Sequence, residues 1–161
     1  MNVFILGEKS GMATRRQFGA GLIAMTSTVG SAVAAQPPIR LTVYRTPACS
    51  CCKAWVSHLE KAGFAAKVVE LDDLAAIKSR AGVPGVYESC HTALAEGYFI
   101  EGHVPAPDIR RLLSEKPDGR GLAVLGMPVG SPGMEVAGMA AEAFDTLLIA
   151  SDGSTRLFAR H

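Results

Sequence analysis

The chain has 161 residues, 48% of them hydrophobic and 19% charged, a composition that excludes a disordered polyelectrolyte or a coiled coil. The formal net charge is +1 without a block of Lys or Arg, so we expect no nucleic-acid partner. This length allows one domain with a single core. Four cysteines are present, and three of them lie within four positions, which makes this cluster the first candidate for function.

Residues 1–34 are predicted to be a cleavable export signal. Arg15 and Arg16 precede an uncharged stretch rich in Gly, Ala, Ser and Thr, which is a twin-arginine pattern. The stretch reaches Ala34 through the small-x-small sequence Ala-Val-Ala, which a signal peptidase can cut. The alternative is an amphipathic helix or a membrane anchor, but the glycines in the stretch make it a weak anchor. We therefore expect a periplasmic domain over 35–161, without stable membrane insertion after cleavage.

The part that follows the signal alternates strands and helices. Apolar residues at helical spacing and β-branched runs predict a strand, a helix, a strand and a helix, over residues 39–44, 50–62, 66–71 and from Asp72 or Asp73 to about Ala81. This order implies a parallel strand–helix–strand unit. Next come two short strands that turn at Gly97 and a helix from Pro105 or Pro107 to Leu113.

Strand, helix, strand, helix, hairpin and helix is the thioredoxin-like order. A loop rich in Gly, Pro and Met over 126–138 and a final hairpin over 146–159 complete the chain. We therefore predict an α/β fold, with a thioredoxin-like mixed sheet flanked by helices and a C-terminal loop and β-hairpin extension. In such a fold the first helix begins at the cysteine cluster.

Three thiols, Cys49, Cys51 and Cys52, lie at the start of the first predicted helix. Free amide N–H groups and the helix dipole favour thiolates there. Cys49 and Cys52 are spaced as in thiol–disulfide exchange proteins, but a third thiol beside them invites wrong pairing. Three convergent thiolates are instead good ligands for a soft cation. A metal site is favoured, while a redox pair and a stapling disulfide with a buried thiol remain open. A bacterial periplasm oxidises thiols, which is compatible with each of these.

Further candidates for the site come from later segments. The loop that enters the third strand of a thioredoxin-like fold faces the start of the first helix, so Cys90 would complete a set of four thiols. His91 and His103 offer imidazole nitrogens, or are capped or surface side chains. Met127 and Met134 offer thioethers, which select Cu(I), or fill gaps in the packing. Copper is favoured over zinc, because the cysteines lack the two separated pairs of a zinc ribbon.

At these residues the sequence resembles the thioredoxin-like, periplasmic metal-binding proteins of copper-resistance loci, catalogued as domain of unknown function 411. The matching stretches are residues 46–52, 88–93, 101–105, 126–128 and 130–135. The resemblance implies copper binding by Cys49, Cys51, Cys52 and Cys90 and a role in copper tolerance that includes the option of copper redox chemistry. The residues His91, His103, Met127 and Met134 match the family at positions whose roles the resemblance leaves open.

The sequence thus predicts a periplasmic copper-binding protein of copper resistance. It would hold copper as Cu(I), one ion or more, in a cysteine-bridged site, and we expect a metal-binding protein rather than an enzyme. A thiol–disulfide oxidoreductase using Cys49 and Cys52 is the alternative from the enzyme class. An adaptor for periplasmic copper efflux or oxidase components is the third hypothesis.

Overall fold

The computed structural model describes residues 37–161, so the predicted signal over 1–34 lies outside the described residues. The strands are β1 (Ile39–Arg45), β2 (Phe64–Glu70), β3 (His91–Ala95), β4 (Tyr98–Glu101), β5 (Gly121–Val124), β6 (Asp145–Ile149) and β7 (Thr155–Arg160). The helices are α1 (Ser50–Lys61), α2 (Ala75–Ala81), α3 (Ala106–Glu115) and the short 3-10 helix η1 (Gly85–Tyr87). None of the helices over 37–161 is long and apolar enough to cross a membrane.

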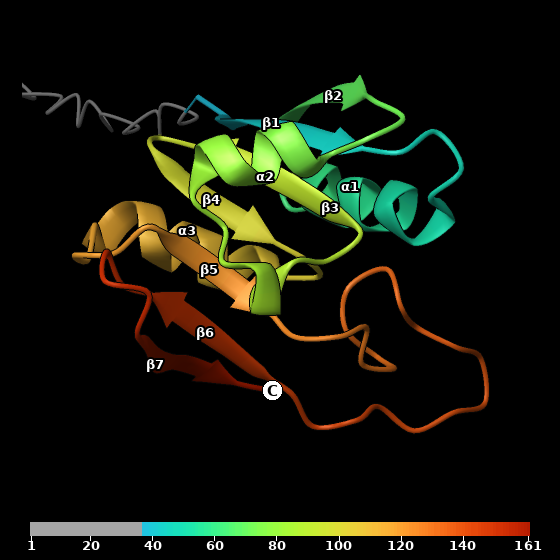
Figure 1. Ribbon diagram of the computed structural model, residues 1–161. Helices are drawn as coiled ribbons and strands as arrows, with labels where there is room; N and C mark the ends of the chain where they lie inside the picture. The colour runs from blue at the N-terminus through green and yellow to red at the C-terminus, as the bar shows by residue number, and fades with distance from the viewer. Residues whose placement is uncertain (1–36) are drawn as a thin grey trace, which may run out of the picture. The chain divides into compact units, whose positions relative to one another are not determined.

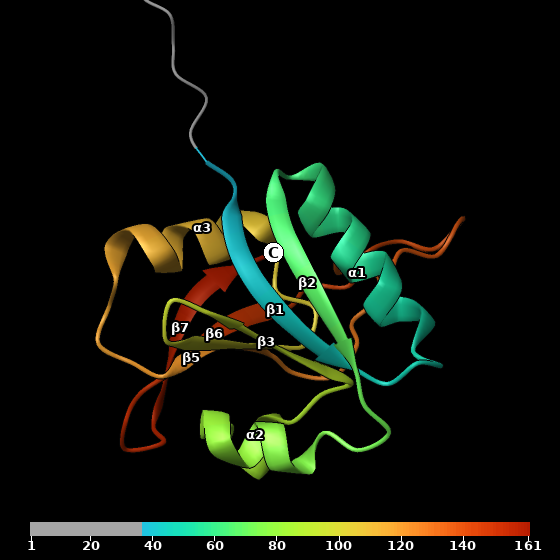
Figure 2. The same ribbon diagram turned by 90° about the horizontal axis from the view of Figure 1, so that it is seen from above.

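The strands form one mixed sheet of seven strands in the order β2-β1-β3-β4-β5-β6-β7. Helices α1 and α3 cover one face of the sheet and α2 covers the other, as Figures 1 and 2 show. The main core fills the space under α1 and α3, where residues such as Trp55, Leu59 and Ile109 are fully buried. This arrangement confirms the predicted α/β fold with a mixed sheet flanked by helices.

The unit β1-α1-β2 sets the position of the cysteine cluster. β1 and β2 are parallel, as predicted, so α1 must begin near the end of β1 and run back along the sheet. Trp55, Val56 and Leu59 form the buried side of α1, and Gly63 reverses the chain with a φ of +83°. The first turn of α1 therefore lies at the end of β1, beside the start of β3.

Strand β5 was not predicted from the sequence. Its four residues are all buried, so the segment lacks the alternation of polar and apolar residues that marks a strand covered on one face. β5 lies parallel to β4, and a side chain at Gly121 would collide with the carbonyl oxygen of Phe99. The strand extends the sheet toward the final hairpin of β6 and β7, which was predicted correctly.

The loop between β5 and β6 returns to the start of α1 (Figure 2). Gly133 in this loop has a φ of +87°. A Cβ atom there would lie 2.7 Å from the Trp55 backbone nitrogen and 2.9 Å from the Cys51 carbonyl oxygen. Glycine is required because both the backbone conformation and the close approach exclude a larger residue. One side of the cysteine cluster is thus covered by the C-terminal extension.

Candidate metal centre

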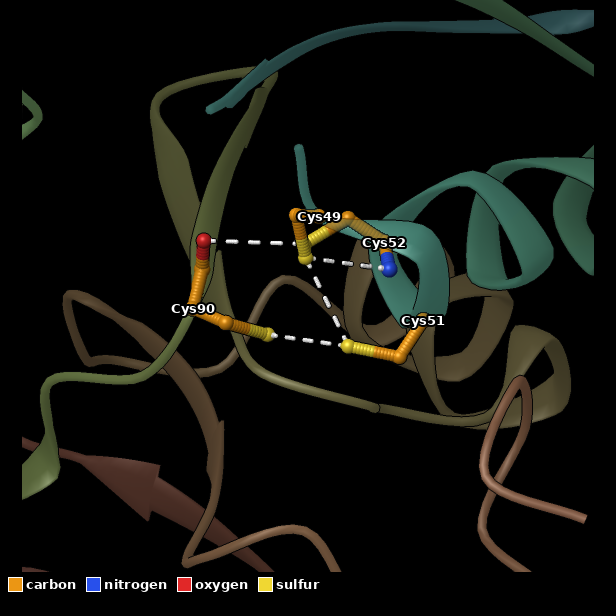
Figure 3. A group of neighbouring side chains, drawn as sticks. All are labelled: Cys49, Cys51, Cys52 and Cys90. Carbon is orange, nitrogen blue, oxygen red and sulfur yellow. Dashed lines mark hydrogen bonds between the residues drawn. A yellow bond between two sulfur atoms is a disulfide. The ribbon is translucent and has the colours of Figure 1, made fainter. Parts of the chain in front are cut away.

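The four cysteines come together at the start of α1. Their sulfur atoms all lie within 4.8 Å of one another, although Cys90 is far from Cys49, Cys51 and Cys52 in the chain. Figure 3 shows Cys90 facing the first turn of α1 from the segment that leads into β3. The Cys51 and Cys90 sulfurs are 3.8 Å apart, and those of Cys49 and Cys51 are 3.5 Å apart. The convergence of these residues was expected from the sequence.

Two of the four sulfurs are joined in a disulfide. The bond links Cys49 to Cys52, and Cys51 and Cys90 are free. Cys49 is also the N-cap of α1, and its sulfur accepts a hydrogen bond from the Cys52 amide at 3.3 Å. Because the thiolate is the form of cysteine that binds a metal, only Cys51 and Cys90 could serve as ligands in this oxidation state. Reduction by two electrons restores the set of four.

Cys90 differs electrostatically from the cysteines of α1. Burial, followed by the neighbouring Cys51 thiolate, raises the pKa of the Cys90 thiol to about 11. The first turn of α1, by contrast, directs its amide N–H groups and its positive dipole end toward the sulfurs there. A cation between Cys51 and Cys90 would remove the repulsion between their thiolates, and its binding would release a proton.

His103 presents a nitrogen atom to Cys90 in a fixed orientation. The side chain is 0% exposed, and Nδ1 lies 2.8 Å from the Pro132 carbonyl oxygen. Because a carbonyl oxygen can only accept, Nδ1 carries the proton and Nε2 keeps its lone pair. Nε2 lies 3.5 Å from the Cys90 sulfur. Burial also lowers the pKa of His103, which favours the neutral ring. A neutral imidazole oriented through its other nitrogen is typical of metal-binding histidines.

His91 also lies close to Cys90. It is 0% exposed, and Nδ1 lies 3.4 Å from the Cys90 sulfur. Its ring lies against Trp55, with the centroids 4.3 Å apart, and the Trp55 indole donates to the Val104 carbonyl. Burial, then the nearby His103 and Lys78, lower the pKa of His91 to about 3. Within the described residues its buried Nε2 has no hydrogen-bond partner.

Met127 and Met134 lie in the loop that covers the site, in different surroundings. Met134 is half-buried and lines a hollow of about 380 Å³ together with Cys51, Gly133 and Val136. Met127 is 52% exposed. Met134 is therefore adjacent to the cysteine cluster, and a role of Met127 as a ligand stays a prediction.

The donor set fits a soft metal ion. It consists of sulfur atoms and neutral imidazole nitrogens, and Cys90, His91 and His103 form a second group whose ligand atoms lie within 4.8 Å of one another. Thiolate and thioether sulfur select Cu(I), and imidazole suits copper as well. The unpartnered Nε2 of His91 is a further buried atom that a ligand would satisfy. The residues present therefore match copper chemistry.

Comparisons with known proteins agree with this geometry. No curated protein matches the chain. Residues 87–134 match the family described as protein of unknown function, DUF411. Two solved structures, both titled copper resistance protein CopG, are each 44% identical to the chain and cover 77% of it and 98% of their own length. Their TM-scores are 0.73 for form 2 and 0.72 for form 1. The chain belongs to the DUF411 family. Neither comparison names the fold, so the thioredoxin-like relation stays a prediction.

The sequence did not indicate the polar residues behind the site of this DUF411 protein. Lys78 and Glu101 form a buried ion pair, and Glu101 accepts a hydrogen bond from the backbone of Ser89, next to Cys90. Glu101 lies in one of the stretches that carry the resemblance, yet it had no assigned role. The signal that was overlooked is a charged residue at the end of the otherwise apolar strand 98–101.

Proposed function

We propose that this DUF411 protein binds copper in copper resistance and holds it as Cu(I) in the reduced four-cysteine site. One observation carries the proposal: four sulfurs from two distant segments lie within 4.8 Å of one another, and the Cys90 sulfur also lies within 4.8 Å of nitrogen atoms of His91 and His103. The names of the two related structures support copper as the metal. Bridging thiolates allow more than one ion, because one sulfur can bind two Cu(I) ions.

The proposal assigns a role to each part of the site. Cys51 and Cys52 lie at the dipole of α1, where thiolates are stabilised, and Cys90 completes the sulfur set from the opposite side. His103 and His91 face Cys90 as neutral imidazoles and are the nitrogen ligands. The loop of Met134 lines the hollow beside Cys51.

A Cu(I) titration of the reduced protein lacking residues 1–34 tests this function. We expect tight binding of one or more equivalents under anaerobic conditions, with thiolate-to-copper charge-transfer absorption. The same protein with the Cys49–Cys52 disulfide intact should bind less copper, because only two thiols are then free. Equal copper stoichiometry in the reduced and the disulfide forms would contradict the four-cysteine site.

Thiol–disulfide exchange is a second candidate function. The disulfide joins Cys49 and Cys52, the two residues with the spacing of exchange proteins, and Cys49 is the N-cap of α1. The free Cys51 thiol, 3.5 Å from the Cys49 sulfur, competes with this pairing. Insulin reduction, measured beside the copper titration, distinguishes the two functions.

The place of action and the partners are part of the same proposal. The twin-arginine pattern before residue 35 supports export to the periplasm, where a copper-resistance protein meets incoming metal. Components of a periplasmic copper efflux or oxidase system are the proposed protein partners. Fractionation of cells that produce the full chain, followed by detection of the shortened form, tests the location.

A further inference from the structure

A buried ion pair lies behind the segment that carries Cys90. Lys78 of α2 is 5% exposed and Glu101, at the end of β4, is 0% exposed. Lys78 Nζ bonds to Glu101 Oε1 and donates to Thr92 Oγ1 at 2.9 Å. The Thr92 hydroxyl donates to Glu101 Oε2 at 2.7 Å. A buried ion pair adds little stability relative to packed apolar residues. The contacts of this pair with neighbouring groups therefore explain it better than stability does.

Glu101 holds the backbone of the residue before Cys90. Its Oε1 accepts a hydrogen bond from the Ser89 amide at 2.6 Å. Residues 88–90 lie between η1 and β3 and belong to no helix or strand, so no ladder of hydrogen bonds fixes them. Burial raises the pKa of Glu101, and the hydrogen bonds from its partners oppose that rise by stabilising the carboxylate. The Glu101 carboxylate thus fixes the backbone of residues 88–90, which no helix or strand holds in place.

Close packing restricts the same segment from a second direction. Gly102 has a φ of +73°, and a Cβ atom there would lie 2.8 Å from the Val124 carbonyl and 3.1 Å from Ser89 Oγ. Ser89 therefore lies directly against the end of β4. Its hydroxyl oxygen is 3.9 Å from the Cys90 sulfur, so a shift of Ser89 displaces the thiol.

We propose that Lys78 and Glu101 are positioning residues of the metal centre. By holding the Ser89 amide they keep the Cys90 sulfur opposite Cys51 before any metal binds. Lys78 orients and neutralises the carboxylate, and Glu101 makes the contact with the segment. Ligands fixed in advance bind a metal more tightly, because the cost of ordering them is not paid on binding. This inference rests on the proposed function, in which Cys90 is a copper ligand.

Two double variants separate the hydrogen bond to Ser89 from the charges. Lys78→Met with Glu101→Gln removes both charges and keeps an oxygen acceptor for the Ser89 amide. Lys78→Met with Glu101→Leu removes the charges and the acceptor together. Neither variant leaves an unpaired buried charge, so both are expected to fold. A purely structural role of the pair predicts the same behaviour for both variants.

The first measurement needs no metal. In a background of Cys49→Ser and Cys52→Ser, only Cys51 and Cys90 remain, and their disulfide equilibrium with glutathione gives the effective concentration of one thiol at the other. We expect the leucine double variant to lower this value by about tenfold or more, while the glutamine double variant stays within about threefold of the parent. An unchanged value in the leucine variant overturns the positioning role.

The second measurement is the Cu(I) affinity of the same variants with all four cysteines present and reduced. We expect the leucine double variant to lose about tenfold or more in affinity and the glutamine variant to recover most of it. A lowered effective concentration with unchanged Cu(I) affinity would leave the positioning of Cys90 standing and would contradict its role as a copper ligand. The two failures are thereby distinguished.

Stability is controlled with a variant far from the segment. Leu112→Ala shortens a fully buried side chain of α3 and lowers stability without touching residues 88–90. It should leave the effective concentration of the thiols unchanged, and a loss equal to that of the leucine double variant would overturn the proposal. Should the leucine double variant not fold, Thr92→Val removes the hydroxyl between Lys78 and Glu101. It is then expected to give a smaller loss of about threefold, and no loss would overturn the proposal.

Discussion

The Cys51 and Cys90 sulfurs lie 3.8 Å apart across 39 positions of sequence. The first turn of α1 supplies one thiol, and the segment ahead of β3 supplies the other. Because β1 and β3 are antiparallel neighbours, the residues that follow β1 and those that precede β3 meet at the same end of these two strands. The pairing of β1 with β3 therefore brings the two thiols together. Each thiol can be removed by its own substitution.

Cys90→Ser is expected to lower Cu(I) affinity by well over tenfold, a change of about 1.4 kcal/mol for each factor of ten. A hydroxyl is a poor ligand for Cu(I), and no other sulfur of the cluster reaches the site from that side. Competition titration of the reduced protein measures the change. The exposed Ser50→Ala is the matched control and should bind as the parent does. An affinity equal to that of the parent would remove Cys90 from the site.

Cys51→Ala distinguishes copper binding from disulfide exchange. As a copper ligand, Cys51 lies between Cys49 and Cys90, so its loss should reduce the number of bound Cu(I) ions or weaken them. In a dithiol enzyme its removal should leave insulin reduction intact or faster, because a competing thiol is gone. Unaltered copper stoichiometry together with strong reductase activity would favour the enzyme.

Gly133→Ala should destabilise the protein and disturb the cluster. The added Cβ would lie 2.7 Å from the Trp55 nitrogen, and the φ of +87° is unfavourable for alanine. We expect a loss of about 1–3 kcal/mol in the free energy of unfolding, measured by urea titration of the metal-free protein. Gly138→Ala is the control, since it has a φ of +82° and open space around its Cβ position. The two variants losing equal stability would show that packing against α1 has no part in the effect.

The pKa of His58 is expected to lie below its usual 6.5, because burial disfavours the charged ring. Glu135 raises this pKa and Lys61 lowers it. Glu135→Gln should therefore lower the value further, and Lys61→Met should raise it, as measured by NMR titration. Because the unfolded chain binds this proton more readily than the fold, the contribution to stability is complete above pH 6.5 and declines as the pH falls toward the folded pKa. A pKa above 6.5 in the folded protein would contradict this.

Replacing Arg15 and Arg16 with Lys should leave the precursor in the cytoplasm if export uses the twin-arginine route. Immunoblots of periplasmic and cytoplasmic fractions measure the distribution. Replacement of Lys9, outside the arginine pair, is the control and should permit export. A normal periplasmic yield of the shortened protein from the double variant would argue against this route.

Most of the elements could be predicted because their signals are local. The helix at 50–61 has apolar residues at helical spacing and a glycine stop, and the parallel pair of β1 and β2 follows from the connecting helix. β5 was missed because it is short and buried on both faces, so its residues carry no period. Its place depends on the contact between Gly121 and Phe99, which belongs to tertiary structure.

The convergence of the cysteines could also be predicted from the sequence. The disulfide between two of them and the buried ion pair behind Cys90 could not. Cys90 follows from the position of the loop before the third strand in a fold of this order. A disulfide in the cluster was one of the alternatives to a metal site, since spacing does not fix which thiols are oxidised. Lys78 and Glu101 come from different elements and meet only in the folded protein, so no spacing in the sequence predicts their ion pair.

The disulfide between Cys49 and Cys52 would make the proposed copper capacity depend on the supply of electrons. Each molecule in this state must accept two electrons before all four sulfurs can act as thiolates. In a compartment that keeps thiols oxidised, the amount of metal the protein can carry would follow the activity of the reductants that reach it, and producing more protein would not by itself raise that amount.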